Sequence, residues 1–294
     1  MTAMILNGSE LAKSMRAEIE AEVADFVKKY GYQPTAAVVR AGDDPASISY
    51  SNALEKALGG RGLGFQLHTL PGNATLEEIV ALVTKLNKDT AIHGIMIQEP
   101  LPKGIDEAAV KDVLSPVKDV DGVHPLNAGR LAQVAPIGRP PMVGPFFAPA
   151  TPSGGMEILR RQGVKLAGKH AVVVGRSNIV GKPMALLLLR ENASVTLCHS
   201  QTDNLPGICR TADILCGAVG KAKMIKGDWI KPGAIVIDFG VNFIDEKMVG
   251  DVDFDEAVKV AGMITPVPGG TGPMTNIMLM KNVIAAAKIA AGLK

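Results

Sequence analysis

The sequence predicts an α/β protein of two domains built on mainly parallel sheets. The 294 residues exceed the roughly 250 at which a single hydrophobic core tends to split. Short apolar runs alternate with helical patterns in both halves, and a proline-rich segment separates the halves. Such alternation implies right-handed crossovers, so ligands should bind beyond the carboxyl ends of the strands.

In the first half, an amphipathic helix is predicted from Ser9, with apolar residues at every fourth position, to Tyr30. The elements expected after it are a strand over 35–40, a helix after Pro45, a strand over 64–70, a helix over 76–86 and a strand over 92–97. A site in this half should therefore lie near residues 40–50 and 98–102.

The segment 134–152 is rich in proline, which predicts a linker without regular structure. Strands are predicted beyond it over 171–174, 194–198, 214–216 and 234–237, and an apolar helix over 275–293 should pack back against the first domain. We expect a catalytic domain of residues 1–144 with the C-terminal helix 275–294, and a dinucleotide-binding domain of residues 145–274.

Composition argues against several classes of partner. Thirty-one basic and 29 acidic residues leave a net charge of +2, and no dense basic run suggests nucleic-acid binding. Polar residues interrupt the first 15 positions, which predicts neither a signal peptide nor a membrane span and therefore a cytoplasmic protein. Cys198, Cys209 and Cys216 fit neither a disulfide framework nor a zinc site, so we expect buried, reduced thiols and no metal.

A glycine loop follows the strand 171–174 and precedes an apolar helix. Gly175 suits a tight turn, Gly181 suits close backbone approach, and free N–H groups at the helix start suit a pyrophosphate. The spacing is not G-x-G-x-x-G, so by itself it is equally compatible with a plain βα turn.

The residues after the second strand of this domain bear on the choice of cofactor. No carboxylate ends that strand about 20 residues after the glycines, where NAD-specific folds hold the ribose diol. Arg176 and Ser200 suit a 2′-phosphate, which favours NADP, with NAD possible. Arg176 as a solvated surface residue and His199 as a structural histidine are the alternatives.

Five segments together resemble a known family. They are Gly42 to Ser47 with Tyr50, Gln98 to Pro102, Lys118 to Gly122, Gly175 to Pro183, and Thr265 to Thr275. In this order they resemble the bifunctional methylenetetrahydrofolate dehydrogenase/methenyltetrahydrofolate cyclohydrolase family over nearly the whole chain. The resemblance implies an N-terminal α/β catalytic domain, a Rossmann-type NAD(P)-binding domain, a folate cleft between them, tetrahydrofolate one-carbon derivatives as substrates, and a homodimer.

The resemblance also implies roles for particular residues. Tyr50 would orient the pterin, Gln98 would assist at the reacting carbon, and Asp121 would anchor the pterin ring through two hydrogen bonds. Further folate contacts implied are Pro100, Pro268, Gly269, Gly270 and Thr275, and the cofactor contacts are Thr151, Gly175, Arg176, Ser177, Ile179, Val180, Gly181, Pro183, His199, Ser200, Thr202, Gly240 and Thr271. Without the other segments, a turn residue would be the preferred interpretation of Asp121 and a half-buried core residue that of Tyr50.

One departure from the family pattern bears on activity. Leu54 stands where the family has the lysine that serves as general acid/base for cyclohydrolysis, and Lys56 points about 200° away on the same helix. Because such a group typically contributes 10²–10⁴-fold in rate, we expect a dehydrogenase with weak or absent cyclohydrolase activity. Glu99 in place of leucine and a longer 134–149 segment also depart from the family.

Two other functions stay open from the sequence. One is a bifunctional enzyme in which another group activates water for hydrolysis. Another is a catalytically silent paralogue that binds folate or a nucleotide. A third, an ordinary hydroxy- or amino-acid dehydrogenase, lacks a histidine–carboxylate pair suited to carbonyl protonation.

Overall fold

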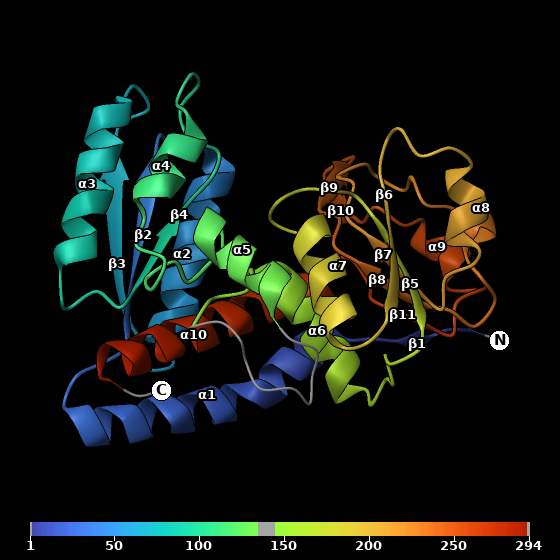
Figure 1. The fold of residues 1–294 in the computed structure, drawn as a ribbon, viewed down its shortest axis with the longest axis horizontal. Helices are drawn as coiled ribbons and strands as arrows, with labels where there is room; N and C mark the ends of the chain where they lie inside the picture. Colours follow the sequence, from blue (N-terminus) through green and yellow to red (C-terminus); the bar gives the residue numbers. More distant parts are fainter. Residues whose placement is uncertain (1, 135–144, 293–294) are drawn as a thin grey trace. The chain divides into compact units, whose positions relative to one another are not determined.

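The computed structural model describes residues 2–134 and 145–292 and divides the chain into two compact units (Figure 1). The six-stranded unit comprises the described residues of Met1–Lys13, Leu131–Gly144 and Thr151–Thr275. The three-stranded unit comprises those of Ser14–Arg130, Pro145–Ala150 and Asn276–Lys294. Each unit has an α/β architecture with a parallel sheet, as the alternation of strands and helices predicts.

The three-stranded unit contains a parallel sheet in the order β3-β2-β4. Its elements are β2 (Thr35–Ala41), α2 (Pro45–Gly59), β3 (Gly64–Leu70), α3 (Leu76–Lys88), β4 (Gly94–Ile97), α4 (Glu107–Val113), most of α5 (Pro125–Gln133) and most of α1 (Gly8–Tyr30). Asp44 caps α2 by accepting a hydrogen bond from the Ser47 amide, and Pro45 occupies the first turn. The predicted strands over 35–40 and 64–70 are confirmed.

The C-terminal helix α10 (Thr271–Ala290) completes a core on one face of this sheet. Its residues Leu279, Val283 and Ile284 pack in one cluster with residues of α1, β2 and α2, which confirms that the helix returns to the first half of the chain. A second cluster on the other face includes Val39 and Val83.

The six-stranded unit contains a parallel sheet in the order β1-β11-β8-β7-β5-β6. Its elements are β1 (Met4–Ile5), α6 (Ala150–Arg161), β5 (His170–Val174), α7 (Gly181–Arg190), β6 (Ser194–Cys198), α8 (Leu205–Cys209), β7 (Ile214–Gly217), the 3₁₀ turn η1 (Gly227–Trp229), β8 (Ile235–Asp238), the antiparallel hairpin β9 (Asn242–Ile244) and β10 (Lys247–Val249), α9 (Phe254–Ala257) and β11 (Met263–Ile264). The three cysteines are free and buried here, as predicted.

Some predicted boundaries are wrong. Helix α6 begins at Ala150, inside the segment predicted to lack regular structure, because Pro152 lies in its first turn, where no intrahelical N–H bond is lost. Strand β4 begins at Gly94, two residues after the predicted start at residue 92, since the Ile92 amide donates to the Asp89 carbonyl in a turn. Most of the longer 134–149 segment lies outside the described residues. None of the helices in the described ranges has both the length and the apolar character of a membrane span.

Candidate functional site

Gln98 directly follows β4, at the carboxyl edge of the three-stranded sheet. Its side chain is 4% exposed, and Nε2 donates to the Ser47 carbonyl of α2 at 2.7 Å. The amide oxygen Oε1 is buried and has no hydrogen-bond partner among the described residues. A buried acceptor without a hydrogen bond raises the free energy of the folded protein. This oxygen can therefore gain a hydrogen bond from a bound group.

Tyr50 and Asp121 are close enough to affect each other's ionisation. Tyr50 is half-buried on α2, and burial together with the Asp121 carboxylate raises the pKa of its phenol, which keeps the hydroxyl protonated. Burial, the Asp119 carboxylate and the Glu99 carboxylate raise the pKa of Asp121 to about 7, while the Lys111 ammonium opposes that rise. Asp121 is therefore poised between its two protonation states near neutral pH.

Neighbouring residues hold the segments that carry this cluster. The buried Asp119 carboxylate accepts hydrogen bonds from the Val123 and His124 amides and from Asn127 Nδ2, which fixes the turn around Asp121. Glu99 forms an ion pair with Lys111 of α4 and precedes the exposed Pro100. The Glu99 carboxylate is thus a negative charge that acts on Asp121.

The structure places Leu54 and Lys56 on different sides of α2. Leu54 is 0% exposed and belongs to the apolar cluster against which Tyr50 packs. Lys56 is exposed. The position that the resemblance assigns to a general acid/base is therefore buried among apolar side chains, and Lys56 lies on another side of the helix.

The loop between β5 and α7 in the six-stranded unit has the backbone that the glycine pattern predicts. Gly175 adopts φ +123°, and a Cβ there would lie 1.9 Å from the Ala218 carbonyl oxygen. A Cβ on Gly181 would lie 2.0 Å from the Gly175 carbonyl oxygen. Both positions thus require glycine. The Ser177 Oγ accepts bonds from the Val180 and Gly181 amides at 3.1 and 3.3 Å, which shapes the start of α7.

Three cavities follow one another along the carboxyl edge of this sheet. One of about 260 Å³ is lined by Gly175, Arg176, Ser177, His199 and Ser200. The next, of about 300 Å³, shares Ser177 and adds Val180 and Gly240. A third, of about 460 Å³, shares Gly240 and extends along Pro268, Gly269, Gly270 and Thr271. The structure thus joins the predicted cofactor loop to the proline-glycine run in one unit.

Other predicted residues support this edge without lining these cavities. Thr202 Oγ1 accepts a hydrogen bond from the His199 amide at 2.8 Å, and Thr275 Oγ1 lies 3.4 Å from Thr151 Oγ1. Ile179 is exposed in the loop and Pro183 is buried in α7.

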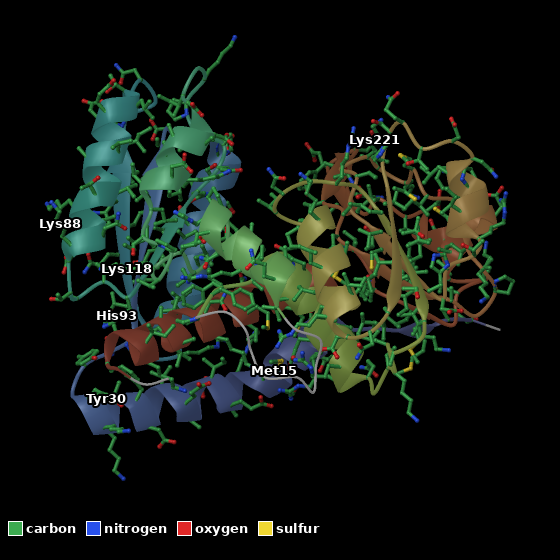
Figure 2. All side chains as sticks on the ribbon, in the orientation of Figure 1. Met15, Tyr30, Lys88, His93, Lys118 and Lys221 are labelled. Carbon is green, nitrogen blue, oxygen red and sulfur yellow. The ribbon has the colours of Figure 1, made fainter. Side chains whose placement is uncertain are left out.

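Sequence reasoning missed Lys221, which lines the same cavity as Arg176 and is labelled in Figure 2. The buried Asp251 carboxylate fixes this loop by accepting hydrogen bonds from the amides of Val219, Gly220 and Lys221 at 2.6, 3.0 and 2.9 Å. The position of Lys221 just after the strand 214–216 was a usable signal, because that strand ends at the ligand-binding edge.

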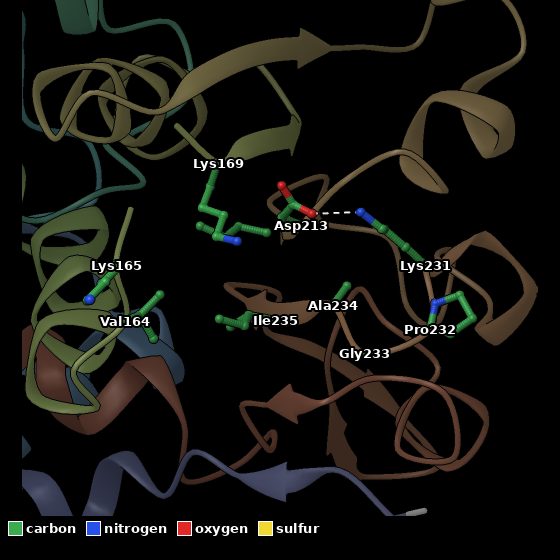
Figure 3. Close-up of a pocket in the computed structure, with 10 residues that line it drawn as sticks. Val164, Lys165, Lys169, Asp213, Lys231, Pro232, Gly233, Ala234 and Ile235 are labelled. Atoms are coloured by element: carbon green, nitrogen blue, oxygen red, sulfur yellow. Dashed lines mark hydrogen bonds and ion pairs between the residues drawn. The ribbon is translucent and has the colours of Figure 1, made fainter. Parts of the chain in front are cut away.

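A further cavity of about 200 Å³ lies at the amino ends of β5, β7 and β8 (Figure 3). Lys169 lines it beside the ion pair of Lys231 with Asp213, whose Nζ–Oδ1 distance is 2.7 Å. None of the predicted site residues lines this cavity, so it offers positions for control substitutions.

Comparison with known proteins gives consistent matches over both halves. Residues 149–291 match the model of the tetrahydrofolate dehydrogenase/cyclohydrolase NAD(P)-binding domain, and residues 6–121 match that of the catalytic domain. The chain is 50% identical to the bifunctional protein FolD of Roseiflexus sp. (strain RS-1) over 98% of this chain and 97% of the relative.

The solved structures of two related enzymes also match this chain over nearly its whole length. The bifunctional enzyme FolD from Campylobacter jejuni matches with a TM-score of 0.92 and 39% identity over 98% of this chain and 99% of that one. The Trypanosoma brucei methylenetetrahydrofolate dehydrogenase-cyclohydrolase, complexed with NADP cofactor and inhibitor, matches with a TM-score of 0.91 and 38% identity over 99% of both chains.

Proposed function

The chain belongs to the tetrahydrofolate dehydrogenase/cyclohydrolase family, and from that premise we propose an enzyme that oxidises 5,10-methylenetetrahydrofolate with NADP and hydrolyses the methenyl product weakly or not at all. The methylenetetrahydrofolate dehydrogenase activity and the use of NADP follow from the family and its NADP-bound relative. The proposed loss of hydrolysis rests on one observation, the fully buried Leu54.

The two reactions make different demands on the protein. In hydride transfer, the lone pair of a folate nitrogen expels the hydride from the adjacent methylene carbon as an amidinium forms, so the protein has to align the substrate and exclude water. In hydrolysis, a water must lose a proton as it attacks the methenyl carbon, which requires a positioned base. Leu54 and its apolar surroundings favour the first reaction only.

We propose that Asp121, Tyr50 and Gln98 bind the pterin from the three-stranded unit. As a carboxylate, Asp121 can accept two hydrogen bonds from an amidine-like ring edge, and the protonated Tyr50 can lie against the ring. The unpaired Gln98 oxygen can lie near the carbon that becomes positive. The roles of Pro100, Pro268, Gly269, Gly270 and Thr275 as folate contacts stay proposals of the same kind.

For the cofactor, the cradle of Gly175 and Gly181 fits a pyrophosphate, because only glycine leaves the backbone this close. We propose that Arg176, Ser200 and Lys221 hold the 2′-phosphate, since all three line one cavity. When bound, NADP accepts the hydride, and the chain's own residues bind it, orient it and exclude water.

Measuring the two activities separately tests the proposal. NADP reduction in the presence of methylenetetrahydrofolate should be readily detected, while methenyltetrahydrofolate hydrolysis should barely exceed the rate without enzyme. Hydrolysis as fast as in FolD relatives would contradict the role assigned to Leu54. Folate binding without cofactor reduction would favour a silent binding protein instead.

Replacing Arg176 with alanine should raise the KM for NADP by about tenfold or more and leave the KM for NAD nearly unchanged, because the lost bond is a charge-assisted one to phosphate. Steady-state kinetics with both cofactors provide the measurement. Lys169→Ala, at the amino-end cavity, is the matched control. An equal rise in the KM for NADP and in the KM for NAD would show that Arg176 does not contact the 2′-phosphate.

We propose that the protein is a homodimer that associates through the β9–β10 hairpin. Phe243, Ile244 and Met248 of the hairpin are 65%, 41% and 37% exposed, and Val241, which directly precedes β9, is 61% exposed. Large apolar side chains gathered on one exposed element are typical of an association surface.

Replacing Phe243 with aspartate should convert the dimer to a monomer at micromolar concentration, because a charge would enter the apolar contact. Light scattering after size-exclusion chromatography gives the mass. Leu67→Asp, on an exposed position of the three-stranded unit, should leave the dimer intact. A monomeric parent protein, or a Phe243→Asp variant that stays dimeric, would contradict the proposal.

Two further expectations stay proposals. We assign folate binding to residues 1–144 with 275–294 and cofactor binding to residues 145–274. We also propose a cytoplasmic location, which the three unpaired cysteine thiols support, because such thiols persist in a reducing compartment.

A further inference from the structure

Arg40 is a buried cation at the carboxyl end of β2. It is 9% exposed, and no other arginine or lysine in the described ranges 2–134 and 145–292 is buried to this extent. Its Nη1 donates to Ser51 Oγ at 2.8 Å, while its Nε is buried without a hydrogen-bond partner. Among those residues, no carboxylate forms an ion pair with it.

The sheet register places Arg40 beside Gln98. Val39 of β2 pairs with Ile97 of β4, and the Gln98 amide donates to the Val39 carbonyl at 2.9 Å. The next residues along these parallel strands, Arg40 and Gln98, therefore point to the same face of the sheet. That face carries α2, since Val38 packs in the same cluster as Leu54.

Both side chains join one buried network on α2. Ser51 Oγ donates to the Ser47 carbonyl at 2.9 Å, and the same carbonyl accepts from Gln98 Nε2 at 2.7 Å. Ser47, Ser51 and Gln98 are 7%, 1% and 4% exposed. Two atoms in the network have no partner, the donor Nε of Arg40 and the acceptor Oε1 of Gln98.

Burying this unpaired charge raises the free energy of the folded state unless a ligand provides a partner for it. A buried charge without a counter-ion loses its hydration, and Arg40 lies beside the first turns of α2, where the helix dipole is positive and disfavours a cation. Arg40 is also the cross-strand neighbour of Gln98, at the proposed reaction centre. The buried arginine therefore does not stabilise the fold. A hydrogen bond from its guanidinium to an electron-rich oxygen of a bound molecule would explain why it is there.

We propose that Arg40 is a further substrate-binding residue of this enzyme, whose guanidinium donates a hydrogen bond to a carbonyl oxygen of the tetrahydrofolate substrate and holds the network that orients Gln98. This inference rests on the proposed function. An arginine stays protonated at physiological pH, so it can hold an oxygen but cannot remove a proton from water. It thus holds a substrate oxygen without supplying a base for hydrolysis.

Arg40→Met tests this directly, because methionine keeps much of the length and removes the charge. The KM for methylenetetrahydrofolate should rise about 10- to 100-fold, with the KM for NADP unchanged, since the lost bond is charge-assisted. The melting temperature should stay equal or rise, because an uncompensated buried charge is removed. A merely structural arginine would give the opposite pattern, a lower melting temperature with an unchanged KM, and that result would overturn the proposal.

Further variants keep the test decisive. Arg61→Met is the matched control, because Arg61 also has an unpaired Nε in the same unit but is only half-buried, with Nη1 on the Ala57 carbonyl. It should leave both KM values unchanged. If Arg40→Met does not fold, Ser51→Ala should still raise the folate KM severalfold, and Arg40→Lys should restore part of the affinity. An unchanged folate KM in Ser51→Ala would then overturn the proposal.

Calorimetric titration with tetrahydrofolate separates this inference from the proposed function. If the parent protein does not reduce NADP, the proposed function alone is refuted. If the parent and Arg40→Met bind tetrahydrofolate with equal affinity, the role of Arg40 is refuted. A buried water would then be the partner of its Nε.

Discussion

Replacing Leu54 with lysine is expected to raise the rate of methenyltetrahydrofolate hydrolysis by about 10²–10⁴-fold, the contribution of a positioned acid/base. The position is 0% exposed and lies in the cluster that Tyr50 joins, so the new amine would be desolvated. Desolvation lowers the pKa of a lysine, and a neutral amine can then accept a proton from water near neutral pH. Hydrolysis is followed by the loss of methenyl absorbance without cofactor.

The matched control for this variant is Leu58→Lys, which buries a lysine one turn later on the same face of α2. Both variants should lower the melting temperature, because each buries an amine in an apolar cluster. Only Leu54→Lys should gain hydrolysis. Equal gains in both variants, or none in a folded Leu54→Lys protein, would contradict the explanation based on this position.

Replacing Asp121 with asparagine is expected to lower kcat/KM for methylenetetrahydrofolate by about 10²-fold, because one of two charge-assisted hydrogen bonds would meet an NH₂ group instead of an oxygen. The KM for NADP should stay unchanged. Asp25→Asn, at an exposed position of α1, is the control and should leave both values as they are. If kcat/KM for methylenetetrahydrofolate falls by less than threefold in Asp121→Asn, Asp121 does not contact the substrate.

The pH dependence of the parent enzyme should report the same carboxyl group. The pKa of Asp121 is raised to about 7 by burial, by Asp119 and by Glu99, so half of the molecules carry the protonated form near pH 7. Only the carboxylate accepts both hydrogen bonds, so kcat/KM for the folate should rise between pH 6 and pH 8 and level off above. Asp121→Asn should lack this rise, and Glu99→Leu should shift its midpoint to lower pH.

The raised pKa also has a consequence for stability. A carboxyl whose folded pKa lies above its unfolded value favours folding most below the unfolded pKa, and this contribution is lost as pH rises through about 7. The charged form, which we propose binds the substrate, is therefore the one that the fold disfavours. Substrate binding should in turn lower the pKa of Asp121, since it stabilises the carboxylate.

By itself, the sequence determined several features that depend on local periodicity and on glycine. Alternation predicted the strands at 64–70 and 194–198 with the bounds that the structure has. The helical repeat placed Leu54 on the face of Tyr50 and Lys56 away from it, because neighbours four residues apart share a side of a helix. Gly175 and Gly181 marked the close turn because no side chain fits there.

Only the tertiary structure decided which distant segments meet. The pairing of Val39 with Ile97 makes Arg40 a neighbour of Gln98, and Asp251 holds the loop of Lys221 from 30 residues away. Strand β1 pairs with β11, which lies near the other end of the chain. Local propensity cannot specify such pairings, because they depend on how whole helices and strands bury their apolar faces against one another.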